Sequence, residues 1–215
     1  MTGAAPTLVR SHWDRLYDIS GTVCLDNVDV GGITVNQEKG LNAEFLAALI
    51  NSSVLNFVFL QTAAPFRGGY YSANRQFIEP LPLPSIDIVN PDDKVHHDTI
   101  VLLYEWIAWI YLRLSIARNT EDSAKDVLIA NYFEQWLNAL VCELYFPTEL
   151  HEANLFFFDL VQAEGLRRLE LLSEADRLPC LRRLFEISYA PDHKLRLALY
   201  RLGSLDLVRV IEGKA

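Results

Sequence analysis

The chain has 215 residues, of which 51% are hydrophobic and 22% are charged, so it can bury one large or two small hydrophobic cores. Its formal net charge is −9 at pH 7, which is opposite in sign to that of proteins that hold nucleic acid by their overall charge. Any contact with DNA must therefore depend on a local patch or on a basic partner domain.

The cysteines and the N-terminus indicate a cytoplasmic chain. Cys24, Cys142 and Cys180 lie far apart without Cys-x-x-Cys spacing, which argues against a disulfide framework and against a structural metal site. Residues 1–6 lack the charged-then-apolar pattern of a signal peptide. The most apolar run, residues 100–114, is shorter than the roughly 20 residues that span a bilayer, so we expect a buried helix and no membrane contact.

The first part of the chain reads as strands followed by a helix. Apolar and polar residues alternate over 22–26 and 33–35, which predicts two short strands. Asn42 is a suitable helix N-cap with Glu44 in the first turn, and apolar residues then recur at helical spacing from residue 45 to 60. We expect one helix over 45–60 that packs on the strands.

A glycine turn and a proline-rich segment follow this helix. Gly68 and Gly69 mark the turn, after which a short strand is expected to end at Ile78. Prolines alternate with leucines over 80–84 and predict an extended segment, and 90–93 reads as a loop or linker.

The remainder of the chain is mostly helical in pattern. We expect three helices at 95–118, 124–145 and 149–172, then shorter elements that include a helix after Pro191 and a strand-like stretch at 205–211. The sequence therefore predicts an α+β protein: a small mixed α/β recognition domain (residues 1–90) followed by a largely helical domain (residues 91–215).

One segment differs from the rest of the chain in charge. No acidic residue occurs between Glu44 and Glu79, although the chain has 28 of them. The segment carries residue types that read base edges or bind phosphate, around a glycine pair that allows close approach of the backbone. These candidate DNA-binding residues are Arg67, Gly68, Gly69, Tyr70, Tyr71, Asn74, Arg75 and Gln76. The alternative is an ordinary surface turn whose aromatic rings pack beneath the strands.

Four motifs in this order resemble a known family. They are LINSSVLNFVF (49–59), FRGGYY (66–71), QFIEPLP (76–82) and, more weakly, WLNALVCELY (136–145). Together they are similar to the TaqI-like C-terminal specificity domain of adenine-specific DNA methyltransferases and Type IIG restriction–modification enzymes, over roughly residues 14–160. The resemblance implies recognition of double-stranded DNA by this chain. It also implies that a separate methyltransferase domain or subunit transfers the methyl group from S-adenosylmethionine, so we expect no cofactor and no catalytic residue here.

The chain departs from this family in two respects. The family's catalytic Asn-Pro-Pro-aromatic motif has only a partial counterpart in Asn90-Pro91-Asp92-Asp93, which lacks the second proline and the aromatic residue. The acidic balance is the other departure, because neither residues 1–90 nor the rest of the chain is basic by itself.

Three other patterns have ordinary explanations. Pro191-Asp192 with Glu212-Gly213-Lys214 mimics a magnesium-dependent nuclease motif, but such a site needs paired strands and the residues after Asp192 have helical spacing. His96 and His97 are adjacent, so on a helix they point about 100° apart, and we expect a solvated helix start. The aromatic residues around Trp106 predict an internal core, or else a face that packs on a partner.

Two functions therefore remain in competition. The first is a non-catalytic DNA target-recognition module. The second is a helical scaffold for protein contacts, without DNA affinity and able to form homo-oligomers, which the negative charge favours.

Overall fold

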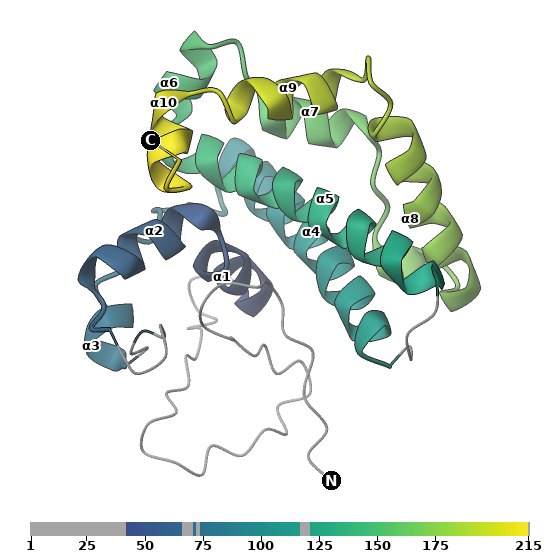
Figure 1. Ribbon diagram of the computed structural model, residues 1–215, viewed down its shortest axis with the longest axis horizontal. Helices are drawn as coiled ribbons and strands as arrows, with labels where there is room; N and C mark the ends of the chain where they lie inside the picture. The colour runs from purple at the N-terminus through teal and green to yellow at the C-terminus, as the bar shows by residue number, and fades with distance from the viewer. Residues whose placement is uncertain (1–41, 66–70, 72–73, 117–120, 215) are drawn as a thin grey trace, which may run out of the picture.

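The computed structural model describes residues 42–65, 71, 74–116 and 121–214 (Figure 1). The helices are α1 (Ala43–Ile50), α2 (Ser53–Thr62), α3 (Arg75–Ile78), α4 (Pro91–Ile116), α5 (Glu121–Tyr145), α6 (Pro147–Glu152), α7 (Phe157–Ala163), the 3-10 helix η3 (Leu169–Leu171), α8 (Glu174–Ser188), α9 (Lys194–Leu202) and α10 (Asp206–Ile211).

The predicted α+β class is wrong. Within the described ranges the structure has no strand, and its one β-type pairing is an isolated antiparallel bridge between Pro65 and Tyr71. The stretch expected to end as a strand at Ile78 is α3, and the strand-like stretch at 205–211 is α10. The strands predicted at 22–26 and 33–35 lie outside the described residues.

The two longest helices, α4 and α5, form an antiparallel hairpin at the centre of the molecule (Figure 1). Helix α4 begins within the predicted linker: the side-chain oxygen of Asn90 accepts the N–H of Asp92 at 2.9 Å, and Pro91 is the first helical residue. Proline is favoured there because its missing N–H would have no partner within the helix. The helix predicted at 95–118 is confirmed as far as Ile116, where the described range ends, and the helix predicted at 124–145 is confirmed.

Aromatic side chains fill the centre of this hairpin. Trp106 and Trp136 are fully buried, and the indole N–H of Trp106 donates to the carbonyl of Arg167 at 2.7 Å. The ring of Trp136 lies 4.6 Å from that of Phe133. The expected internal aromatic core is confirmed for Trp106 and Tyr104, which are buried, whereas Trp109 and Tyr111 are partly buried against it.

The apolar stretch 45–60 forms two helices instead of one. Asn42 caps α1 as predicted, accepting the N–H of Phe45 at 3.0 Å. The chain then bends by 63° between α1 and α2. Ser52 is the N-cap of the second helix, because its backbone is extended and its hydroxyl accepts the N–H of Leu55. Both helices bury apolar side chains against the hairpin, α1 on α4 and α2 on α5.

No single helix in the described part of the chain is long and apolar enough to cross a membrane, and only the bent pair α1 and α2 together meets that criterion by length and composition.

The helix predicted over 149–172 is divided into α6, α7 and η3. Asn154 has φ +53° and Gly165 has φ +65°, a left-handed conformation that ends a helix. Helix α9 confirms the prediction after Pro191. Helices α7, α8 and α9 pack against α5, and α10 packs against α2.

One hydrophobic core includes buried residues from both sides of residue 90, such as Phe45 and Leu55 before it and Ile100 and Leu140 after it. The domain boundary near residue 90 stays a prediction.

Candidate functional site

The predicted DNA-binding segment falls partly within the structure. Arg67, Gly68, Gly69 and Tyr70 lie outside the described residues. Tyr71, Asn74, Arg75 and Gln76 are described and belong to α3 or its approach, at the edge of the molecule beyond α2 (Figure 1).

Tyr71 has a structural environment. Its backbone pairs with Pro65 in the isolated bridge. Its half-buried ring lies edge-on to the buried ring of Phe59, with 6.5 Å between the centroids. The side chain therefore joins the segment before α3 to α2.

Helix α3 presents polar side chains on an apolar anchor. The first hydrogen bond of its turn runs from the N–H of Phe77 to the carbonyl of Asn74, at 2.9 Å. Phe77 and Ile78 pack against the core. The side chains of Asn74, Arg75 and Gln76 are exposed. The packing of Phe77 and Ile78 holds the helix against the core, and three neighbouring side chains with hydrogen-bonding groups face solvent from the same turn.

Arg75 has an internal ion-pair partner. Its Nε lies 3.0 Å from Glu79 Oε2 and its Nη2 lies 3.2 Å from Oε1, one helical turn away. The pair lowers the pKa of Glu79, first through the hydrogen bond and then through the charge of the guanidinium. The side chains are 87% and 64% exposed, and water and salt screen such exposed pairs strongly. Arg75 can therefore exchange this partner for another anion at low cost.

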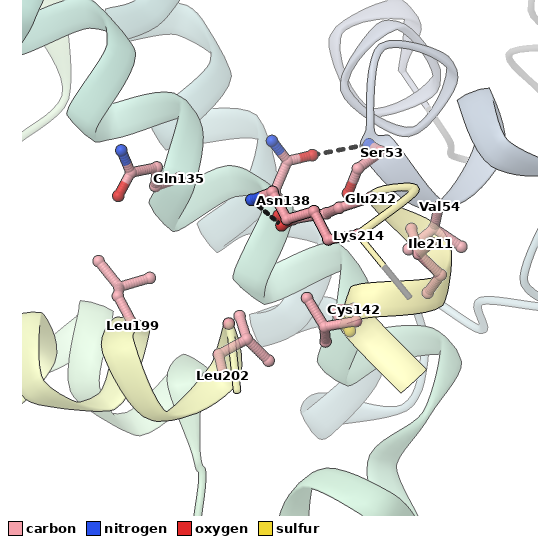
Figure 2. Close-up of a pocket in the computed structure, with 12 residues that line it drawn as sticks. Ser53, Val54, Gln135, Asn138, Cys142, Leu199, Leu202, Ile211, Glu212 and Lys214 are labelled. Atoms are coloured by element: carbon pink, nitrogen blue, oxygen red, sulfur yellow. Dashed lines mark hydrogen bonds and ion pairs between the residues drawn. The ribbon is translucent and has the colours of Figure 1, made fainter. Parts of the chain in front are cut away.

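A cavity of about 310 Å³ lies between α2, α5, α9 and α10 (Figure 2). On one side α5 contributes Gln135 and Asn138, and the carbonyl oxygen of the Asn138 side chain accepts the N–H of Ser53 at 2.8 Å. After α10, Lys214 pairs with Glu212 at 2.5 Å. The rest of the lining is largely apolar: Val54, Cys142, Leu199, Leu202, Val208 and Ile211.

The thiol in this cavity is not activated for nucleophilic chemistry. Burial, with the negative charges of Glu212 and Glu143, raises the pKa of Cys142 to about 12. A thiol is a nucleophile only as the thiolate, so at neutral pH Cys142 behaves as a small apolar side chain. This agrees with its burial in the hydrophobic core.

The nuclease-like residues do not come together. Glu212 and Lys214 line the cavity in Figure 2, whereas Asp192 lines a different one with Glu164 and His193. In the part of the chain that the structure describes, no group of three or more His, Cys, Asp and Glu side chains could hold a metal ion.

The adjacent histidines point to different helices, as their spacing predicts. The ring of His97 is buried 4.7 Å from that of Phe45 in α1, and the ring of His96 stacks at 3.9 Å on Phe158 in α7. The expected solvated helix start is wrong for His97, since α1 covers it.

Comparison of the chain with protein-family models, with curated proteins and with solved structures finds no match.

Proposed function

We propose that the chain is a DNA target-recognition module of a restriction–modification adenine methyltransferase, non-catalytic by itself, which contacts double-stranded DNA with α3 and the residues before it. The observation that supports this most is the exposed row Asn74, Arg75 and Gln76 on an anchored turn, within a segment free of acidic residues from 45 to 78. In this proposal the bases are read from a helical turn, and no strand is needed.

Each side chain has a role that its chemistry suits. Asn74 and Gln76 carry amides, which pair with the N6 and N7 edge of adenine in the major groove. Arg75 bonds to guanine or to a phosphate, and Arg67 is proposed to do the same from the segment before α3. Gly68 and Gly69 let the backbone approach the duplex. The methyl donor S-adenosylmethionine would bind the separate methyltransferase domain.

The ion pair with Glu79 makes this proposal sharply testable. If Arg75 leaves Glu79 to contact a phosphate, Arg75→Ala weakens binding to all sequences alike and lowers the salt slope by about 1. Glu79→Gln removes the competing carboxylate and should strengthen binding severalfold at low salt. In contrast, Asn74→Ala and Gln76→Ala should each reduce discrimination between sequences by about 1–3 kcal/mol, the value of one bidentate hydrogen-bonded pair with a base.

The measurement is fluorescence anisotropy of the full chain with a duplex pool and with selected sites, at 50 and 200 mM salt. The double variant Arg67→Ala/Arg75→Ala should lose the most DNA affinity. Arg183→Ala on α8, which is also exposed, is the matched arginine control. Equal affinities for wild type, Arg67→Ala/Arg75→Ala and Glu79→Gln would reject these roles.

The alternative is a helical scaffold without DNA affinity, which the net charge of −9 favours. It predicts no salt-dependent binding to any duplex and a stable complex in native mass spectrometry. The anisotropy series at two salt concentrations separates the two functions, since only recognition of DNA gives a signal that salt weakens.

A further inference from the structure

Helix α9 carries an outward face that the DNA-recognition proposal does not use. Leu195, Ala198 and Leu202 point into the core. The opposite side presents four exposed side chains, Lys194, Leu197, Tyr200 and Arg201. Residues 193–205 include no acidic residue. We call these four residues, together with Arg196 and Tyr189, the α9 surface. Helix α9 lies on the opposite side of the α4–α5 hairpin from α3 (Figure 1).

Arg196 holds the aromatic part of this surface in place. Its guanidinium lies 4.1 Å from the ring centroid of Tyr189 and 5.6 Å from that of Tyr200. It also donates to the carbonyl of Tyr189 and to the hydroxyl of Tyr200. Tyr189 in turn stacks on Phe185 at 4.8 Å. Because these side chains are already ordered, a partner that binds them loses less conformational entropy than with a free side chain.

The α9 surface has the composition of a protein interface more than that of a phosphate-binding surface. Leu197 is 47% exposed and Tyr200 63% exposed beside two cations. Tyrosine and arginine carry much of the binding energy in protein interfaces, usually next to apolar contacts. A DNA backbone offers nothing to an exposed leucine, so a partner with both acidic and apolar groups fits better.

The same chain exposes such a partner at the start of α4. Val89 is 85% exposed and lies among Asp87, Asp92 and Asp93. Two hydrogen bonds hold the turn: the N–H of Val89 donates to Asp87 at 3.0 Å, and the N–H of Asp87 donates to Asp93 at 2.9 Å. We call residues 87–93 the acidic turn. The negative charge and the protruding valine of the acidic turn are complementary to the α9 surface. Asp87, Val89 and Asp92 are exposed, so the α9 surface of the same chain does not cover them.

We propose that the α9 surface of one copy of this chain binds the acidic turn of a second copy, head to tail. Two different surfaces then meet, which gives a closed ring if the rotation closes and an open chain if it does not. The contact brings Lys194 and Arg201 toward Asp92 and Asp93, and Tyr200 and Leu197 toward Val89. The contact does not depend on DNA binding by α3.

The test is sedimentation velocity of the full chain over a range of concentrations, at 50 and 300 mM salt. Wild type should associate, and more weakly at high salt. Two charge-reversed variants, Lys194→Glu and Asp92→Lys, change exposed side chains and leave the bond from Asp87 to Asp93 in place. Each should be monomeric alone because like charges face each other. An equimolar mixture of the two should associate again, since the reversed α9 surface of one meets the reversed acidic turn of the other.

Tyr200→Ala tests the apolar part without changing charge and should weaken association at least tenfold, with an unchanged helical circular dichroism spectrum. A wild type that stays monomeric at all concentrations overturns the proposal. So does a mixture of the two variants that remains monomeric, or a loss of DNA affinity in Tyr200→Ala without any self-association, which would make the α9 surface a nucleic-acid contact.

Discussion

The carboxylate of Glu143 holds the start of α7, and its removal should be among the most damaging single changes in the chain. Glu143 is on α5 and 6% exposed. It accepts the backbone N–H of Phe157 at 2.6 Å and that of Phe158 at 2.9 Å, both buried, and its other oxygen lies 2.8 Å from His151 Nε2. The first N–H groups of a helix have no acceptor within the helix. Here the Glu143 carboxylate is the acceptor for two of them at the start of α7.

The magnitude follows from these bonds. Glu143→Ala leaves two buried N–H donors without an acceptor, at about 1–3 kcal/mol each. The contact with His151 adds little, because 43% of that side chain is exposed to solvent. We expect the free energy of unfolding to fall by about 3 kcal/mol or more, which for a chain of this size lowers Tm by roughly 6–12 °C.

The assay is urea unfolding followed by circular dichroism at neutral pH. One oxygen of Glu143 accepts both N–H groups. The amide oxygen of Glu143→Gln can accept them as well, so this variant should lose less stability than Glu143→Ala. The control is Glu152→Ala, an exposed position on the neighbouring α6, with a change below about 0.5 kcal/mol. If Glu143→Ala loses no more than Glu152→Ala, the carboxylate does not cap α7 and the reasoning is refuted.

Three further outcomes follow from single groups. Burial raises the pKa of Glu134 in the folded chain, so the stability that the chain has at low pH is lost as the pH rises through that pKa. Glu134→Gln should therefore increase the free energy of unfolding at pH 7 and leave it unchanged at pH 4, as measured by urea unfolding at the two pH values. Ser52→Ala should cost about 1–2 kcal/mol in the same assay because it removes the α2 cap. Iodoacetamide should label half-exposed Cys180 well before Cys142 in the native chain, as read by peptide mass mapping, since the pKa of Cys142 is raised to about 12.

The central helices and one cap could be predicted from the sequence. The signals of α4 and α5 are long apolar patterns, and length alone separates a helix from a strand when the pattern is continuous. Asn42 is a cap residue directly before the first apolar turn, and its side chain makes the expected bond. Such signals depend on a few neighbouring residues, so no tertiary information is needed to read them.

The errors lie where tertiary packing decides between similar local patterns. The stretch 205–211 is short and apolar and reads equally as strand or helix; packing against α2, where Val208 is buried, makes it α10. Ser52 interrupts an apolar run that otherwise reads as one helix, although an Asn-Ser-Ser sequence is itself a cap signal. Asn154 and Gly165 carry the same kind of information for the break before and after α7.

In the predicted site, the partner of Arg75 is readable from the sequence once the stretch is treated as a helix. Glu79 follows Arg75 by four residues, the spacing at which opposite charges meet on a helix. The prediction of a strand conceals this pair, because residues four apart on a strand are not neighbours on one turn. The contact of Tyr71 with Phe59 agrees with the alternative of a surface turn with packed aromatic rings. It could not be predicted from the sequence, because it depends on where α2 lies.

The net charge of −9 and a DNA contact at α3 are compatible because charge acts over a limited distance. At physiological salt the Debye length is about 8 Å, so exposed acidic residues on distant helices are largely screened at α3. The charge that a phosphate meets there is local: Arg75 against Glu79, in a segment with no other acidic residue back to Glu44. Solvent weakens this exposed pair. If the chain binds DNA as proposed, a phosphate of the duplex would therefore displace Glu79 from Arg75 at little cost in free energy.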